Sequence, residues 1–237
     1  MYILVFTLGL TLTVTASSPR VVIPFISNPP EIDGNLSDAI WEQSVLVQDF
    51  KMAGTIDPAP LRTVVRLLCD GKFLYAGFDC EEPEINRVRE AMKSFQEASW
   101  DADLVEMHFD IPHGGSQYRE CVINPNGLGA AGFVMDETAA QQFRSAAHYR
   151  DNAWTAEIAL PLKAYGVDPL NTQVVWGANI RRFRTFFDSQ LDESYQWAGN
   201  PAGMTDTSGY GEFVLGPDTG LIIESLRCDA EGIGQGN

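Results

Sequence analysis

Hydrophobic and polar residues alternate most regularly between Leu104 and Ile111. The positions on one face of an extended strand are all apolar: Val105, Met107, Phe109 and Ile111. The positions on the other face are mostly polar: Leu104, Glu106, His108 and Asp110. Because successive side chains of a strand point to opposite faces, the pattern predicts a strand with one core face and one polar face. A solvated outer face gives the same alternation as a binding face.

Further strands are expected at several places along the chain. Two apolar-rich runs flank Asp70-Gly71 between Arg62 and Cys80, which predicts a β-hairpin. Four more strands are expected, at residues 117–123, 154–160, 174–183 and 212–215. The passage 128–147 predicts only partial strand.

Helical spacing is confined to short segments. Apolar residues recur every three or four positions within 81–99, which predicts a short surface helix. Ser37 is placed to cap another short helix that packs Trp41 inward. Many short strands, few helices and no alternation of the two predict an all-β antiparallel β-sandwich with one or two short helices.

The two ends of the chain differ from this pattern. Residues 1–16 form an uncharged, mostly apolar run that ends in small residues, which is typical of a secretory signal peptide. Residues 17–30 form a Pro-rich approach segment, residues 31–217 the sandwich, and residues 218–237 a Gly-rich C-terminal tail. We therefore expect a secreted or periplasmic protein without an integral membrane segment after removal of the signal.

Composition narrows the possible partners. The 237 residues carry 32 Asp and Glu against 16 Lys and Arg, a formal net charge of −16. Such a surface repels phosphate, which argues against nucleic acid as a partner. It is compatible with cations and with neutral sugars. An aromatic ring beside carboxylates, as in Trp100 with Asp101 and Asp103, suits a polyol or sugar.

The four cysteines do not have metal-site spacing. Cys69 and Cys80 lie on the two strands of the expected hairpin, with Cys69 near Leu74 and Cys80 several residues further along. Their sulfurs are then too far apart for a disulfide, and both are expected to be small core side chains. A pairing with Cys121 or Cys228 stays open.

No recognisable catalytic motif is present: nucleophile elbow, phosphate-binding loop, dinucleotide fingerprint and zinc-binding helix are all missing. Paired carboxylates, such as Glu106 with Asp103 or Glu157, leave glycoside hydrolysis as an alternative to a non-catalytic role. The cluster of Arg181, Arg182 and Arg184 is more typical of carboxylate partners than of a ligand site.

Candidate metal ligands and histidines are less specific. Asp101 with Asp103, or Asp79 with Glu81 and Glu82, supplies oxygen donors of the kind that calcium prefers, although acidic loops without a ligand are commoner. The three histidines are scattered along the chain, and a lone histidine is usually structural.

Seven short segments occur in order between Ile32 and Leu215. They are Ile32-Asp33-Gly34 with Trp41; LLCDGKFLYAGFDCEEP; Trp100 ahead of Asp103-Leu104-Val105-Glu106 and Asp110; Gln117-Tyr118-Arg119; WTAEIALP from Trp154; Trp176-Gly177-Ala178-Asn179 with Arg181 or Arg182; and Tyr210-Gly211-Glu212-Phe213. Together they resemble the family 9 carbohydrate-binding modules, DOMON-like β-sandwiches appended to xylanases and related enzymes.

The resemblance implies roles for individual residues. In sugar-binding members two tryptophans enclose a terminal sugar ring, a Glu and an Arg bind its hydroxyls, and calcium supports the fold. Trp100 falls on the first tryptophan, Glu106 on the carboxylate and Arg119 on the arginine. Met204 falls where the second tryptophan is expected. Trp197 lies a little earlier and corresponds better to a structural tryptophan of the family.

The resemblance implies a non-catalytic module that binds a neutral oligo- or polysaccharide in carbohydrate catabolism, with a glycoside hydrolase as its partner. Two alternatives follow from Met204. Related sandwiches hold haem through Met and Lys, and the candidate lysines are Lys51, Lys72, Lys93 and Lys163. The missing tryptophan is also compatible with a structural or interaction module that has lost sugar binding.

Overall fold

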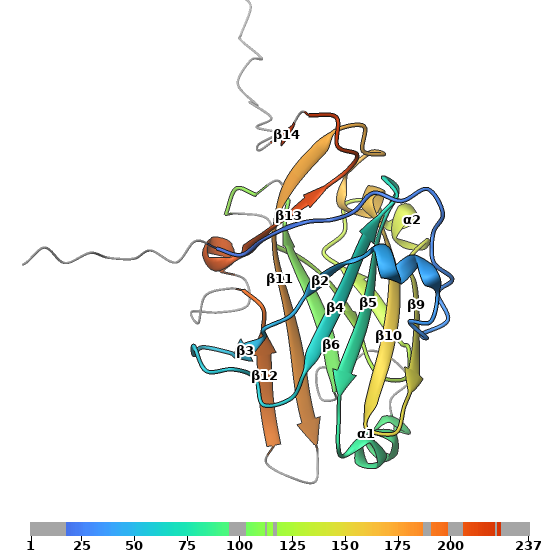
Figure 1. Cartoon of the computed structure of the whole chain (residues 1–237), viewed down its shortest axis with the longest axis vertical. Coiled ribbons are helices and arrows are strands. Elements are labelled where there is room, and N and C mark those ends of the chain that lie inside the picture. Colours follow the sequence, from blue (N-terminus) through green and yellow to red (C-terminus); the bar gives the residue numbers. More distant parts are fainter. Residues whose placement is uncertain are drawn as a thin grey trace, which may run out of the picture.

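The chain folds into two β-sheets packed face to face (Figure 1). The computed structural model describes residues 18–94, 103–111, 113–115, 118–186, 191–198, 206–220 and 222–223. Within them, the helical elements are short: α1 (Ile85–Met92), α2 (Glu137–Ala140), η1 (Ala39–Gln43), η2 (Leu162–Tyr165) and η3 (Thr207–Gly209). The predicted all-β sandwich is confirmed.

The five-stranded sheet contains the hairpin. Its order is β2 (Val45–Val47), β4 (Thr63–Cys69), β5 (Phe73–Glu81), β10 (Ala153–Pro161) and β9 (Arg144–Tyr149). The turn forms because Asp70 Oδ1 accepts the amides of Lys72 and Phe73, each at 2.8 Å, and Gly71 adopts a φ of 84°. Cys69 pairs with Leu74 and Cys80 with Thr63, so the predicted separation of the two cysteines is confirmed.

The nine-stranded sheet contains the strand with the polar face. Its main order is β1 (Arg20–Val22), β13 (Gly211–Leu215), β11 (Gln173–Phe186), β6 (Leu104–Asp110), β7 (Tyr118–Ile123) and β8 (Gly129–Gly132). β12 (Leu191–Gln196) and β14 (Ile222–Ile223) pair with β11, and β3 (Lys51–Met52) pairs with β12. The long β11 extends beyond the predicted strand because β12 continues its ladder as far as Phe186.

The core lies between the two sheets. The five-stranded sheet contributes Phe78 and Trp154, and the nine-stranded sheet contributes Phe109 and Trp176, all almost fully buried. The rings of Phe109 and Trp176 meet edge to face at 5.7 Å. Each such side chain stabilises the fold by about 1.5–3 kcal/mol through burial. Cys69, Cys80 and Cys121 are free thiols in the same core, and burial raises the pKa of Cys69 to about 11.

A second apolar cluster covers the outer face of the five-stranded sheet. It is formed where residues 26–44, the N-terminal cover, cross that face (Figure 1), and its buried members are Ile26, Trp41, Leu68, Tyr75 and Ala159. Glu157 of β10 accepts hydrogen bonds from Trp41 Nε1 at 2.7 Å and from the amides of Gly34 and Asp33 at 2.7 and 2.9 Å. One carboxylate therefore fixes the cover.

Charged side chains are buried where β5, β6 and β11 come together. Arg182 Nη2 lies 3.2 Å from Glu82 Oε2 and 3.5 Å from Asp103 Oδ2, and all three side chains are almost fully buried. Arg184 Nε donates to Glu82 Oε2 at 2.7 Å. A buried charge without a partner destabilises the fold, so each of these groups depends on the presence of the others. The prediction that the arginines are carboxylate partners is confirmed for Arg182 and Arg184.

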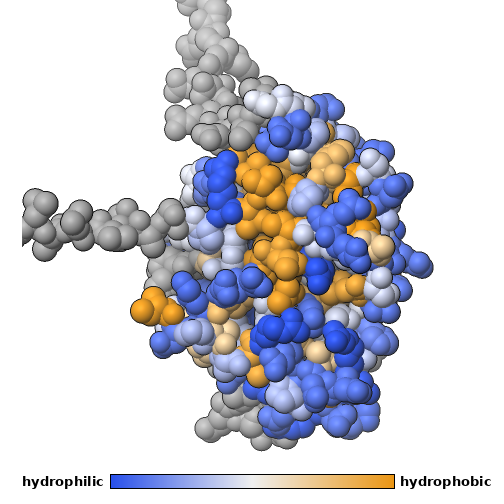
Figure 2. Space-filling model, in the orientation of Figure 1, coloured by the Kyte–Doolittle hydropathy of each residue, from blue (hydrophilic) through white to orange (hydrophobic). Residues whose placement is uncertain are grey.

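An apolar strip runs down the middle of the face that carries the N-terminal cover (Figure 2). The exposed large apolar side chains of the molecule include Val22, Phe25 and Leu46, from β1, β2 and the segment between them. None of the helices in the described part of the chain has the length and apolar character needed to cross a membrane.

Candidate saccharide-binding site

The outer face of the nine-stranded sheet is polar along three neighbouring strands. Register places Glu106 of β6 opposite Arg181 of β11, and His108 opposite Asn179. On the other side of β6, His108 lies opposite Glu120 of β7, and Asp110 opposite Tyr118. We call this set the polar face: Glu106, His108, Asp110, Tyr118, Glu120, Asn179 and Arg181. The predicted alternation of β6 therefore continues across its neighbours.

Glu106 and His108 form a buried pair at the centre of the polar face. His108 Nε2 lies 2.9 Å from Glu106 Oε2, and both side chains are almost fully buried. Aromatic rings flank the imidazole, with Tyr118 edge-on at 5.3 Å and Tyr210 stacked at 6.4 Å between centroids. The carboxylate is thus held at one oxygen by a group that is itself fixed by packing.

Arg181 supplies the positive charge of the polar face. Its Nη2 donates to Ser194 Oγ at 3.0 Å, and its guanidinium lies 4.7 Å from the centre of the Phe183 ring. Burial lowers the pKa of Arg181 from its usual value, and the nearby Glu106 opposes that shift. The side chain is half-buried, so part of it reaches solvent. A guanidinium and a carboxylate in this position can bind sugar hydroxyls as donor and acceptor.

Asp110 and the Tyr118–Glu120 pair of the polar face stabilise the local structure. Asp110 Oδ2 accepts the amides of Gly114 and Gly115 at 2.9 and 2.6 Å, which anchors the loop after β6. The Tyr118 hydroxyl donates to Glu120 Oε2 at 2.5 Å. Glu120 and Tyr118 are half-buried, so this pair forms a part of the polar face that reaches solvent.

Arg119 points to the other side of β7. It pairs with Phe109, a core-facing residue of β6, and its Nη1 donates to the Phe133 carbonyl at 2.8 Å. The structure therefore does not bring Arg119 together with Glu106. The arginine opposite Glu106 is Arg181, which the sequence interpretation had not treated as a ligand residue.

Strand periodicity contained the signal for Arg181. Gly177, Asn179 and Arg181 occupy alternate positions, and the residues between them are the buried Trp176, Ala178 and Ile180. Tyr210 precedes β13 rather than lying on a strand, and no pattern in the sequence indicated that its ring contacts His108.

The remaining predicted ligand residues are placed only in part. Trp100 and Met204 lie outside the described residues. Trp197 is partly buried against the main core, with its ring 5.6 Å from that of Phe213. This position agrees with the structural role that the resemblance implies for it.

The predicted calcium ligands that the structure describes have arginine partners. Asp103 lies beside Arg182, and Asp79 lies 2.9 Å from Arg62 and 3.5 Å from Arg150. Asp101 lies outside the described residues. Among the residues that are described, no three His, Cys, Asp or Glu side chains gather as a metal site. Asp79 and Asp103 do not fit calcium, since a guanidinium occupies the position that a cation would take.

The positions of the four candidate lysines do not support haem ligation. Lys51 lies in β3, Lys72 in the β4–β5 turn, Lys93 after α1 and Lys163 in η2, and all four are exposed. Carboxylate pairing is also not observed for Glu157, because it lies on the outer face of the other sheet from Glu106.

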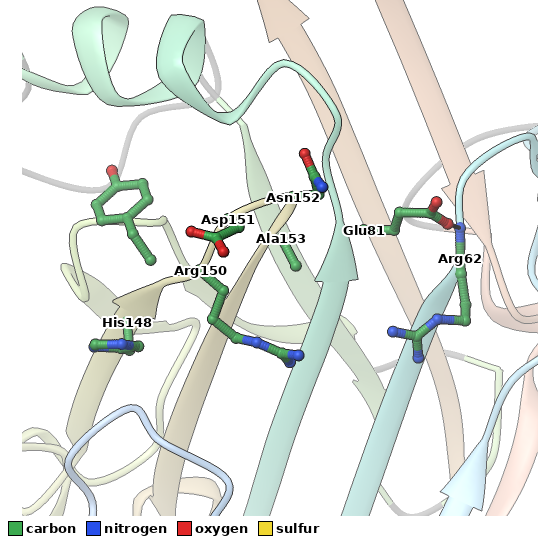
Figure 3. Close-up of a pocket in the computed structure, with 8 residues that line it drawn as sticks. Arg62, Glu81, His148, Arg150, Asp151, Asn152 and Ala153 are labelled. Atoms are coloured by element: carbon green, nitrogen blue, oxygen red, sulfur yellow. Dashed lines mark hydrogen bonds between the residues drawn. The ribbon is translucent and has the colours of Figure 1, made fainter.

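A concave region lies at the end of the five-stranded sheet. It has a volume of about 680 Å³ and is lined by Arg62, Glu81, His148, Tyr149, Arg150, Asp151, Asn152 and Ala153 (Figure 3). Figure 3 shows the side chains of Arg62, just before β4, and Arg150, just after β9, extending toward each other across this region. Both guanidiniums are already paired with the Asp79 carboxylate.

Comparison with known proteins decides the family. A model described as carbohydrate family 9 binding domain-like matches residues 32–216. The chain belongs to this family. It is a family of non-catalytic carbohydrate-binding modules, in agreement with the prediction of a module without catalytic function.

Solved structures share the fold of this family 9 chain. A family 9 module from Caldicellulosiruptor kristjanssonii in complex with cellotriose is 15% identical, with a TM-score of 0.63, covering 91% of this chain and 100% of that one. A family 9 module of the same organism with glucose is 15% identical, with a TM-score of 0.62, covering 82% and 94%. A search of curated protein sequences finds no match.

Proposed function

We propose that the protein binds a neutral saccharide at the polar face. The observation that carries this proposal is the placement of Arg181 opposite Glu106 on the outer face of the nine-stranded sheet. A carboxylate accepts hydrogen bonds from sugar hydroxyls and a guanidinium donates to their oxygens, and such charged hydrogen bonds are stronger than neutral ones.

The substrate class follows from charge and from the related structures. The chain carries a net charge of −16, which disfavours acidic polysaccharides. The structures with cellotriose and glucose suggest β-linked glucose oligomers as the first ligands to test. We also propose export by the signal at residues 1–16 and a role beside a glycoside hydrolase in polysaccharide breakdown.

Calorimetric titration with cello- and xylo-oligosaccharides tests the proposal. Binding of a neutral oligosaccharide is expected, and polygalacturonate should not bind. Arg181→Gln and Glu106→Gln should each weaken binding about tenfold or more, since a charged hydrogen bond contributes about 1.5–3 kcal/mol. Arg66→Gln, on the outer face of the other sheet, is the matched control and should bind like the wild type.

Tryptophan fluorescence adds an independent measurement for Trp100. If its ring packs on the sugar as the family resemblance implies, the ligand-dependent change should disappear in Trp100→Ala. Absence of binding across a broad panel of neutral glycans would contradict the proposed function.

A further inference from the structure

His108 is placed to control Glu106, and this inference rests on the proposed saccharide site. We propose that His108 is a positioning residue that fixes the Glu106 carboxylate for the sugar. The first support is the 2.9 Å contact between His108 Nε2 and Glu106 Oε2, which holds one carboxylate oxygen in a fixed direction.

The hydrogen-bond pattern identifies which nitrogen of His108 acts on Glu106. An ionised carboxylate only accepts hydrogen bonds, so His108 donates to Glu106 from Nε2. His108 Nδ1 is buried and has no hydrogen-bond partner. The imidazole therefore acts on its surroundings through the hydrogen bond to Glu106.

Charged and polar groups surround the pair. They are Asp110 on β6, Tyr118 and Glu120 on β7, Arg181 on β11 and Tyr210 before β13. Arg181 provides a positive charge opposite Glu106. His108 lies two positions further along β6, so the carboxylate has one neighbour along its own strand and one across it.

Aromatic rings also pack against the imidazole. The ring of Tyr118 lies edge-on at 5.3 Å and that of Tyr210 stacks at 6.4 Å between centroids. Because the side chain is fully buried beside these rings, its Nε2 is held toward Glu106.

Two substitutions separate positioning from packing. His108→Gln keeps an N–H donor within reach of Glu106, whereas His108→Phe fills the space and donates nothing. His108→Gln should bind the oligosaccharide within about twofold of wild type, and His108→Phe about tenfold more weakly.

Calorimetry of the full chain provides the test, with His148→Gln, an exposed position of β9 in the other sheet, as the control. His148→Gln should bind like the wild type. If His108→Phe does not fold, His108→Leu, which also donates no hydrogen bond, replaces it. Equal affinities of the wild type and the variant without a donor, or an equal loss in His108→Gln, overturns the role of His108 and leaves the proposed function standing. No binding by the wild type overturns both.

Discussion

Trp41 and Glu157 are joined across 116 sequence positions by a 2.7 Å hydrogen bond from the indole Nε1 to Oε1 of the carboxylate. Oε2 of the same carboxylate accepts the amides of Asp33 and Gly34. Ile32-Asp33-Gly34 and Trp41 carry part of the family resemblance. Their contacts show that this part concerns stability of the N-terminal cover and not the binding face.

Glu157→Gln should destabilise the fold by about 2–4 kcal/mol. The amide keeps one acceptor oxygen and places an NH₂ group against donors, so buried hydrogen bonds are lost. Urea unfolding followed by tryptophan fluorescence measures the change. Glu31→Gln, at an exposed position of the cover, should unfold like the wild type. Equal unfolding midpoints for Glu157→Gln and wild type would contradict the role of Glu157.

Gly34→Ala should cost more stability than Gly115→Ala. Both glycines have positive φ, 88° and 80°, so each substitution introduces about 1 kcal/mol or more of backbone strain. At Gly34 the new Cβ would also lie 2.5 Å from the carbonyl carbon of Ala147, whereas nothing lies within 4 Å at Gly115. We expect about 3 kcal/mol or more for Gly34→Ala. The same loss in both variants would show that the contact with β9 is unimportant.

Arg182→Met should reduce the free energy of unfolding by about 3–5 kcal/mol, because it leaves Glu82 and Asp103 buried without their shared cation. Arg62→Met removes a surface pair with Asp79 and should cost less than about 1 kcal/mol. Chemical denaturation of the two variants side by side checks this difference. A loss below 1 kcal/mol in Arg182→Met would be inconsistent with a set of mutually dependent charges.

Stability should depend on pH through Asp103. Burial raises the pKa of Asp103 to about 6, although Arg182 acts in the opposite direction. An aspartate in the unfolded chain titrates near pH 4, so the folded state binds this proton more tightly. The resulting stabilisation is complete below about pH 4 and is lost as the pH rises through 6.

Asp103→Asn removes this titration. Relative to the variant, the wild type should therefore become less stable from about pH 4 to pH 7. Urea unfolding of both proteins at several pH values gives the difference, in which titrating groups far from Asp103 cancel. A difference that does not change with pH would show that Asp103 has the same affinity for its proton in the folded and unfolded chains.

Strand periodicity predicted the parts of the fold that local pattern determines. The hairpin around Asp70-Gly71, the alternation of β6 and the short strand β10 were all found where they were expected. β1 and β14 were not predicted, since strands this short have too few residues to show a period, and their partners lie far away in sequence. Helix α1 begins at Ile85, inside the predicted segment, because Glu81 still belongs to β5. Residues 95–99 of that segment lie outside the described residues.

The candidate site was predictable only in part. Glu106 was assigned by resemblance and lies on a strand that alternates cleanly, and the structure places it at the centre of the polar face. Arg119 was assigned by resemblance, although its alternation with Cys121 and Ile123 already indicated the core-facing side. Arg181 was passed over because the three arginines were interpreted together as carboxylate partners, although alternation with Asn179 already indicated that Arg181 faces outward.

The distance in sequence between the cover and its anchor has a consequence for biosynthesis. Gly34 and Glu157 are separated by 123 positions, so the N-terminal cover leaves the ribosome long before its hydrogen-bond acceptor exists. Ile26 and Trp41 therefore stay in contact with water or a chaperone until β10 has paired with β5. A nascent chain halted before Glu157 should therefore expose an apolar segment that the finished protein conceals.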